Sequence, residues 1–225
     1  MGQSHDEEFF ETKHVRLNDS LSMTVRQITQ EEYTIRAEAA AYLRHKPHEV
    51  IRDYAQAREM LGDRLKMVQT GDEENHRELE IAFNDGTKLR LNYGGAKVDD
   101  YFLAYYPELN IVILEEEAGG GYAIDFNDSS KNSDHIGNPG NRCPSPDRKL
   151  RINGYYPGGA ADGPVWFIEK QNDADGRYAL LGEWTGESIW EYYYASDWAW
   201  TDNTTVLFKT PGYYYEAKLL PSIRN

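Results

Sequence analysis

From Leu79 onward, apolar and polar residues alternate with a period of two, which is the pattern of β-strands with one buried face. The clearest example is a hairpin, in which Leu79–Phe83 and Lys88–Tyr93 flank the turn residues Asp85 and Gly86. Looser alternation over residues 14–28 predicts one or two N-terminal strands. Further strands are predicted at 101–106, 110–116, 122–126, 149–153, 165–168, 177–184, 188–194, 205–210 and 213–219. Short strands separated by turn residues predict a mostly β fold of antiparallel meander sheets.

Residues 29–62 have a helical period instead. Thr29–Glu32 is a capping-box pattern, with a threonine cap and a glutamate three residues later. Pro47 suits the first turn of a second helix, and Gly62 suits its end. The first helix is expected to bury one apolar stripe, formed by Ile35, Ala39, Tyr42 and Leu43. We therefore predict an N-terminal helical insertion, and one hypothesis is that its helices cover an exposed sheet edge.

The composition indicates a globular protein, with 40% hydrophobic and 13% aromatic residues. A chain of 225 residues can form one large all-β domain or two small ones, and we expect a single domain over residues 1–225. The formal net charge of −14 argues against binding to nucleic acids or anionic membranes, which require a basic face. The same charge fits a basic protein partner, bound cations or simple solubility. The lone Cys143 excludes an internal disulfide, and no apolar run has the length of a transmembrane segment.

Two segments resemble the blade signature of β-propeller proteins. Ser145–Asp147 and the following run Lys149–Asn153 resemble the Ser-Pro-Asp-Gly turn before a Lys/Arg-Leu strand, with Arg148 in place of the glycine. Trp200–Phe208 resembles the Trp, Asp-Asn-Thr and apolar-strand ending of such blades. Residues 79–219 are also similar in motif order to a group of uncharacterised exported bacterial proteins. The shared motifs are Tyr105–Asn110, Gly119–Tyr122, Ser145–Asp147 and Trp200–Thr204.

The resemblance implies a partial propeller-like array of sheets over residues 79–219, because a complete propeller needs a longer chain. It also implies a periplasmic or secreted protein whose signal peptide has been removed, since the printed sequence shows none. A cytoplasmic location stays open. Propeller-like folds support many functions, so the resemblance assigns no activity.

One loop concentrates oxygen ligands of the kind that Ca²⁺ prefers. The candidate metal ligands are Asp125, Asn127, Asp128 and Asp134. The loop lacks the glycine and the closing glutamate of an EF-hand, and solvated turns are the alternative interpretation.

Three sets of residues have the chemistry of catalysis. Glu115 and Glu117 share a strand face and, with Asp99 and Asp100 nearby, provide the paired carboxylates of a hydrolase. A charged edge strand that prevents aggregation explains the same glutamates. Cys143 and His135 are the residue types of a nucleophile and its base. His45 and His48 are metal-ligand types without a third ligand at metal spacing, and a surface pair is the interpretation that we favour.

Aromatic residues are dense in the last third of the chain. The candidate binding residues are Trp190, Tyr192, Tyr194, Trp198, Tyr213 and Tyr215. Tyrosine and tryptophan are frequent anchors of protein interfaces, and they also stack on sugars or fill the core between sheets. We expect a non-catalytic binding protein of the bacterial cell envelope or periplasm that recognises a protein partner. A carbohydrate-binding module and a carboxylate-based hydrolase are the alternatives, and the oligomeric state stays open.

Overall fold

The computed structural model is mostly β, with antiparallel sheets and few helices, as the alternation predicts. It describes residues 12–19, 21–44, 46–70, 77–92, 97–115, 121–130, 136–154, 166–174, 176–183 and 195–221. Within these ranges, no helix has the length and apolar character needed to cross a membrane.

The chain divides into two compact units, and each is described by itself. The first contains Met1–His45, Cys143–Ile152 and Val165–Asn225, and the second contains Lys46–Arg142 and Asn153–Pro164. The helical segment 29–62 is therefore shared between the units. Its first helix belongs to the first unit and its second helix to the second unit.

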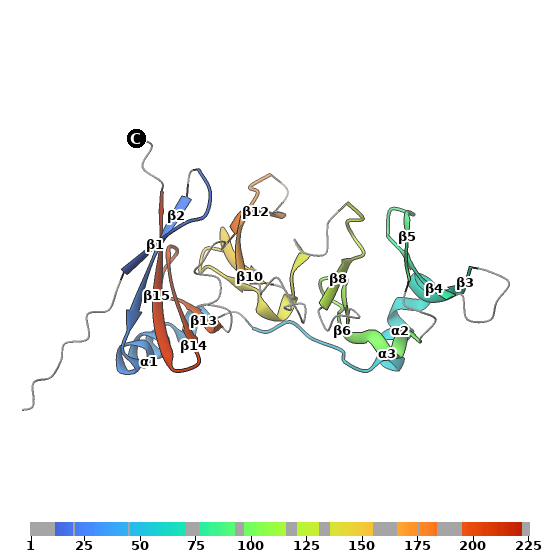
Figure 1. Cartoon of the computed structure of the whole chain (residues 1–225), viewed down its shortest axis with the longest axis horizontal. Helices are drawn as coiled ribbons and strands as arrows, with labels where there is room; N and C mark the ends of the chain where they lie inside the picture. The colour runs from blue at the N-terminus through green and yellow to red at the C-terminus, as the bar shows by residue number, and fades with distance from the viewer. Residues whose placement is uncertain are drawn as a thin grey trace, which may run out of the picture. The chain divides into compact units, whose positions relative to one another are not determined.

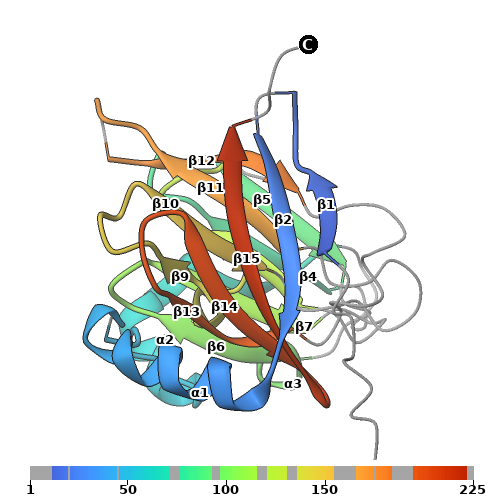
Figure 2. The same ribbon diagram turned by 90° about the vertical axis from the view of Figure 1, so that its left-hand side faces the viewer.

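The first unit is built on a five-stranded antiparallel sheet that contains strands from both ends of the chain (Figures 1 and 2). The predicted N-terminal strands form an antiparallel pair, and the second of them pairs with the last strand of the chain from Ile28 opposite Tyr214 to Leu21 opposite Pro221. The order across the sheet is β1 (Thr12–Arg16), β2 (Leu21–Ile28), β15 (Tyr213–Pro221), β14 (Thr205–Thr210) and β13 (Ser196–Trp200).

A second sheet completes the core of this unit. Its order is β12 (Tyr178–Glu183), β11 (Trp166–Gln171), β10 (Leu150–Gly154) and β9 (Cys143–Pro144). The buried side chains of Met23, Ile152, Ile168 and Phe208 belong to one apolar cluster that unites the two sheets. Burial of this apolar surface is the main stabilising contribution to the unit.

The second unit contains two three-stranded meanders. One consists of β3 (Leu65–Gln69), β4 (Arg77–Ala82) and β5 (Lys88–Asn92), and the other of β6 (Phe102–Tyr106), β7 (Ile111–Glu115) and β8 (Gly121–Asp125). The hairpin predicted around Asp85 and Gly86 is confirmed, and Leu79 lies opposite Leu91 in its register. Buried residues of both meanders form one apolar core. The short helices α2 (Tyr54–Leu61) and α3 (Val98–Tyr101) contribute Ala57, Leu61 and Val98 to this core.

Asp-centred turns join strands in both units. The Asp85 carboxylate accepts hydrogen bonds from the Thr87 amide at 2.8 Å and hydroxyl at 2.6 Å. In the Ser145–Asp147 turn, the Asp147 carboxylate accepts from the Lys149 amide at 3.0 Å. Arg148, which replaces the glycine of the propeller signature, has φ of 60°. Arginine thus occupies a left-handed backbone region that glycine adopts without steric cost.

The first helix, α1 (Gln30–Ala39), begins as predicted, because the Thr29 hydroxyl accepts from the Glu32 amide at 3.1 Å. The predicted buried stripe is wrong. Ile35 is 60% exposed and Tyr42 is 83% exposed, whereas Tyr33 and Ala37 are buried against the sheet. The small Ala37 side chain allows close approach of the helix, and the Tyr33 hydroxyl finds a hydrogen-bond acceptor there.

The edge-covering hypothesis is also wrong for α1. This helix packs on β15, a strand that is paired on both sides, and so covers part of a sheet face (Figure 2). The second helix begins at Tyr54 behind an Asp53 cap instead of at Pro47. It ends at Gly62, as predicted, with φ of 57°.

Candidate binding site in the first unit

Half of the aromatic residues predicted to bind a partner lie outside the described residues, namely Trp190, Tyr192 and Tyr194. The other three have different environments. Tyr215 is 5% exposed and stacks on Phe208 at 5.0 Å between ring centroids. Trp198 is partly buried, and its ring lies 4.6 Å from that of Phe208. Tyr213, which is 53% exposed, is the one of these three whose side chain is available to a partner.

The predicted metal ligands are engaged in turn hydrogen bonds. Asp125 accepts from the Asn127 amide at 3.0 Å, and Asp128 accepts from the Ser130 amide at 3.2 Å and hydroxyl at 2.6 Å. Asp134 lies outside the described residues. Across the described parts of the chain, no three histidine, cysteine, aspartate or glutamate side chains are grouped as a metal site. The calcium site therefore stays a prediction.

The structure places only some of the candidate catalytic residues. Glu115 is exposed at the end of β7, and Asp100 caps α3 by accepting from the Lys97 amide at 3.0 Å. Burial raises the pKa of the Cys143 thiol to about 12, so the thiol is protonated at neutral pH. Glu117, His135 and His45 lie outside the described residues, and His48 instead contacts Glu108 at 3.0 Å.

The first unit contains an open pocket of about 350 Å³ between α1 and the sheet. Tyr33, Thr34 and Glu38 line it from α1, and Arg44 follows the short 3-10 turn η1 (Ala41–Leu43) that continues the helix. The strands contribute Asp197 from β13, Lys209 from β14 and Tyr214 from β15. The Tyr33 and Tyr214 rings contact each other with their centroids 5.1 Å apart.

Asp197 is the centre of the polar contacts in this pocket. Its φ of 55° lies in the left-handed region, at an irregularity in the pairing of β13 with β14. The Lys209 ammonium lies 3.1 Å from one carboxylate oxygen, and the Arg44 guanidinium lies 3.8 Å from the other. The Tyr33 hydroxyl donates to the Asp197 carbonyl at 2.8 Å. These contacts stabilise a backbone conformation that is unfavourable for aspartate in isolation, and such strain is often found at functional sites.

Electrostatics fix the charge states of the two titrating groups at the pocket centre. Burial opposes ionisation of Asp197, but Lys209, the Tyr33 hydroxyl and Arg44 together outweigh it and lower the pKa of the carboxyl group. Burial raises the pKa of Tyr33, and the neighbouring Asp197 charge raises it further. Asp197 is therefore a stable anion and Tyr33 a stable neutral donor at pH 7, which suits binding better than proton transfer.

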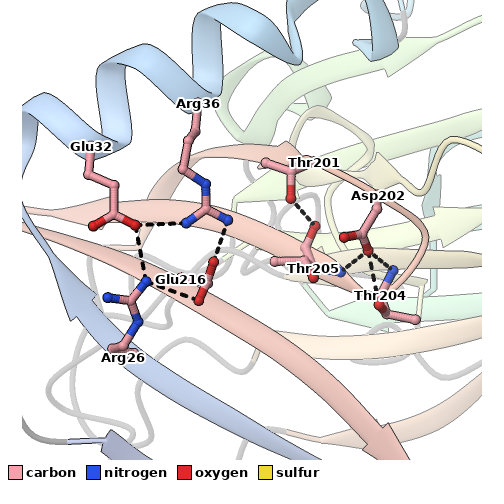
Figure 3. A network of polar contacts seen from close by, with 8 residues as sticks. All are labelled: Arg26, Glu32, Arg36, Thr201, Asp202, Thr204, Thr205 and Glu216. Atoms are coloured by element: carbon pink, nitrogen blue, oxygen red, sulfur yellow. Dashed lines mark hydrogen bonds and ion pairs between the residues drawn. The ribbon is translucent and has the colours of Figure 1, made fainter.

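A network of ion pairs holds α1 on the sheet beside this pocket (Figure 3). Arg26 of β2 lies 3.0 Å from Glu32 of α1 and 3.3 Å from Glu216 of β15. Arg36 of α1 lies 3.0 Å from Glu32 and also pairs with Glu216. The network joins the helix to two neighbouring strands and so fixes the wall from which Tyr33 and Glu38 reach the pocket.

The sequence reasoning missed this site because its residues come from distant segments. Arg44 and Asp197 are far apart in the chain, and neither belongs to a recognisable motif. The apolar stripe predicted for the first helix does not include Tyr33, whose ring forms part of the pocket wall, so the helical periodicity gives no indication of the pocket.

The chain is a mostly β protein of antiparallel sheets, and its pocket is a polar site with room for a small chemical group. No protein-family model, curated protein or solved structure matches the chain. The resemblance to propeller-like exported proteins accordingly stays a prediction.

Proposed function

We propose that the chain is a non-catalytic binding protein that recognises a protein partner through the outer face of α1 and η1 and the adjacent pocket. The observation that carries this proposal is a row of apolar side chains at helical spacing that faces solvent, formed by Ile35, Ala39 and Tyr42. The opposite face of the same helix is buried, so the row is not needed to hold the helix in place. Exposed apolar groups next to a polar pocket are typical of protein-binding surfaces.

The chemistry of the described residues supports binding without catalysis. Asp197 is held ionised by its cationic neighbours, and Cys143 is partly buried with a raised pKa. A general base needs a pKa near the working pH, and a nucleophilic thiol needs a lowered one. No specific observation favours the hydrolase or the carbohydrate-binding alternative.

The location and the finer architecture rest on the resemblance alone. The motifs at 145–147 and 200–204 support an exported protein of the bacterial envelope or periplasm with a partial propeller-like arrangement of sheets.

The test is quantitative affinity capture from an envelope extract of the native organism, with mass spectrometry as the readout. Wild-type protein is compared with the double variant Ile35→Glu/Tyr42→Glu. Met60→Glu is the matched control, because Met60 is an apolar residue on α2 that is 53% exposed. We expect a specific protein to be retained by wild type and Met60→Glu and lost by the double variant. Equal recovery by all three baits would refute the proposed surface.

A further inference from the structure

We propose that the pocket anchors a carboxylate of the partner, from an acidic side chain or a free C-terminus, on Arg44 and Lys209. This inference rests on the proposed protein-binding function and specifies the chemistry of one contact in it.

Arg44 and Lys209 have hydrogen-bond donors to spare. The Arg44 guanidinium lies 3.8 Å from the Asp197 carboxylate, which is too long for a hydrogen bond. Guanidinium offers five N–H donors, two of which can bind both oxygens of a carboxylate in parallel. Lys209 places its ammonium 3.1 Å from Asp197, and an ammonium group has three donors. Both side chains are about half exposed, so a ligand can reach them from solvent.

Asp197 lies between the two cationic groups. Arg44 faces one of its oxygens and Lys209 the other, so both cationic groups are directed toward the same small region of the pocket. The left-handed backbone of Asp197 and the hydrogen bond from Tyr33 to its carbonyl hold this anion in place. A ligand carboxylate therefore meets two pre-positioned cations and does not have to order them, which lowers the entropic cost of binding.

Three features oppose an anion, and none excludes it. Asp197 is itself an anion beside both cations, so a ligand carboxylate has to bind the donors that Asp197 leaves unused. The net charge of −14 acts over the whole chain, but at physiological salt exposed charges are screened beyond about 8 Å. Glu38 lines the same pocket and has no ion pair within the described structure, so its negative charge disfavours an anion bound close to it. Glu38 is useful as a probe, because an anionic and a cationic ligand respond to its removal in opposite directions.

The pocket size limits the ligand group. A volume of about 350 Å³ is near the lower end for ligand sites and accommodates one side chain or a terminal residue of a larger partner. The apolar row on α1 and η1 then remains for neighbouring side chains of the partner.

The test is a titration of the full chain with four short peptides, followed by NMR chemical shifts of the backbone amides. The probes are acetyl-Gly-Asp-Gly-amide, acetyl-Gly-Gly-Gly with a free carboxylate, acetyl-Gly-Lys-Gly-amide and acetyl-Gly-Gly-Gly-amide. We expect saturable shifts around Asp197 with the first two probes only. The tighter of these two distinguishes an acidic side chain from a C-terminus as the source of the carboxylate.

Charge-neutralising variants decide the sign of the interaction. Arg44→Gln and Lys209→Gln should each weaken carboxylate binding by about tenfold, because each removes a charged hydrogen-bond donor. Glu38→Gln should leave carboxylate binding unchanged or strengthen it. Thermal unfolding checks that each variant keeps its fold, and Arg44→Lys, which keeps the charge, should retain part of the affinity.

Two outcomes would overturn the inference. One is preferential binding of the lysine peptide that weakens in Glu38→Gln and strengthens in Arg44→Gln, because the pocket would then take a cation. The other is absence of saturable shifts with every peptide. Neither changes the capture experiment on Ile35 and Tyr42, so failure of this inference and failure of the proposed function are distinguishable.

Discussion

The turn at Asp202 offers a quantitative test of how a motif in the sequence stabilises the fold. Its carboxylate accepts three hydrogen bonds, from the Thr204 amide at 2.7 Å, the Thr205 amide at 2.8 Å and the Thr204 hydroxyl at 2.9 Å (Figure 3). The turn connects β13 to β14, and β14 carries Lys209. Asp202→Ala removes all three acceptor contacts and leaves the buried Thr205 without this partner for its amide.

The size of the effect follows from these contacts. A net hydrogen bond contributes about 0.5–1.5 kcal/mol to stability, and Asp202 is exposed, so water replaces part of the loss. We expect Asp202→Ala to lower the free energy of unfolding by about 1–2 kcal/mol at pH 7. Asp202→Asn keeps one oxygen acceptor and should cost less than the alanine variant. The assay is urea unfolding followed by tryptophan fluorescence.

The same turn predicts a pH dependence. Burial opposes ionisation of Asp202, but hydrogen bonds from Thr204 and Thr205 outweigh it and lower the pKa in the folded state. The carboxylate therefore stabilises the fold above the unfolded-state pKa of about 3.9, and this contribution is lost as the pH falls through the lower folded-state value. The difference between wild type and Asp202→Ala should shrink between neutral pH and pH near 2. A difference that stays constant with pH, or an alanine variant as stable as wild type, would refute this account.

Two further predictions concern packing in the first unit. A β-carbon added at Gly182 would lie 2.8 Å from the Leu17 β-carbon and 3.0 Å from the Leu17 carbonyl oxygen, so Gly182→Ala should destabilise the protein by about 1–3 kcal/mol through overpacking. Calorimetry measures this, and an unchanged melting temperature would contradict the close approach. Cys143 should react with a thiol reagent at pH 8 much more slowly than a free cysteine, because burial raises its pKa to about 12. A reaction rate equal to that of glutathione under the same conditions would show that the thiol is accessible and ionised.

Local sequence patterns predicted most of the strands, but they did not predict which strands from distant parts of the chain pair with each other. The Asp85–Gly86 hairpin depends on residues within one turn, and its register was accessible from alternation alone. The pairing of β2 with β15 joins opposite ends of the chain, and no local preference specifies it. The same limit applies to the pocket, whose polar groups meet only after the sheet has formed.

The error on α1 has a definite physical cause. Two stripes on this helix have the spacing of a buried face, one through Ile35, Ala39 and Tyr42 and the other through Tyr33 and Ala37. The first is the more apolar, and periodicity favours it. The sheet surface selects the second, because the Tyr33 ring packs on Tyr214 and its hydroxyl binds the Asp197 carbonyl. Tertiary contacts thus override the apolar pattern and leave the more apolar stripe at the surface.

The five-stranded sheet of the first unit has a consequence for synthesis of the protein. Three of its strands, β13 to β15, are translated last, so β2, which pairs with β1 along one edge, waits for nearly the whole chain before β15 pairs with its other edge. The second unit has a contiguous segment from Lys46 to Arg142 whose meanders pair near neighbours, and such local pairings form fast. We therefore expect folding on the ribosome to begin in the middle of the chain, while the N-terminal hairpin keeps an open edge. Until Pro221 leaves the exit tunnel, that edge is exposed to other nascent chains and to chaperones.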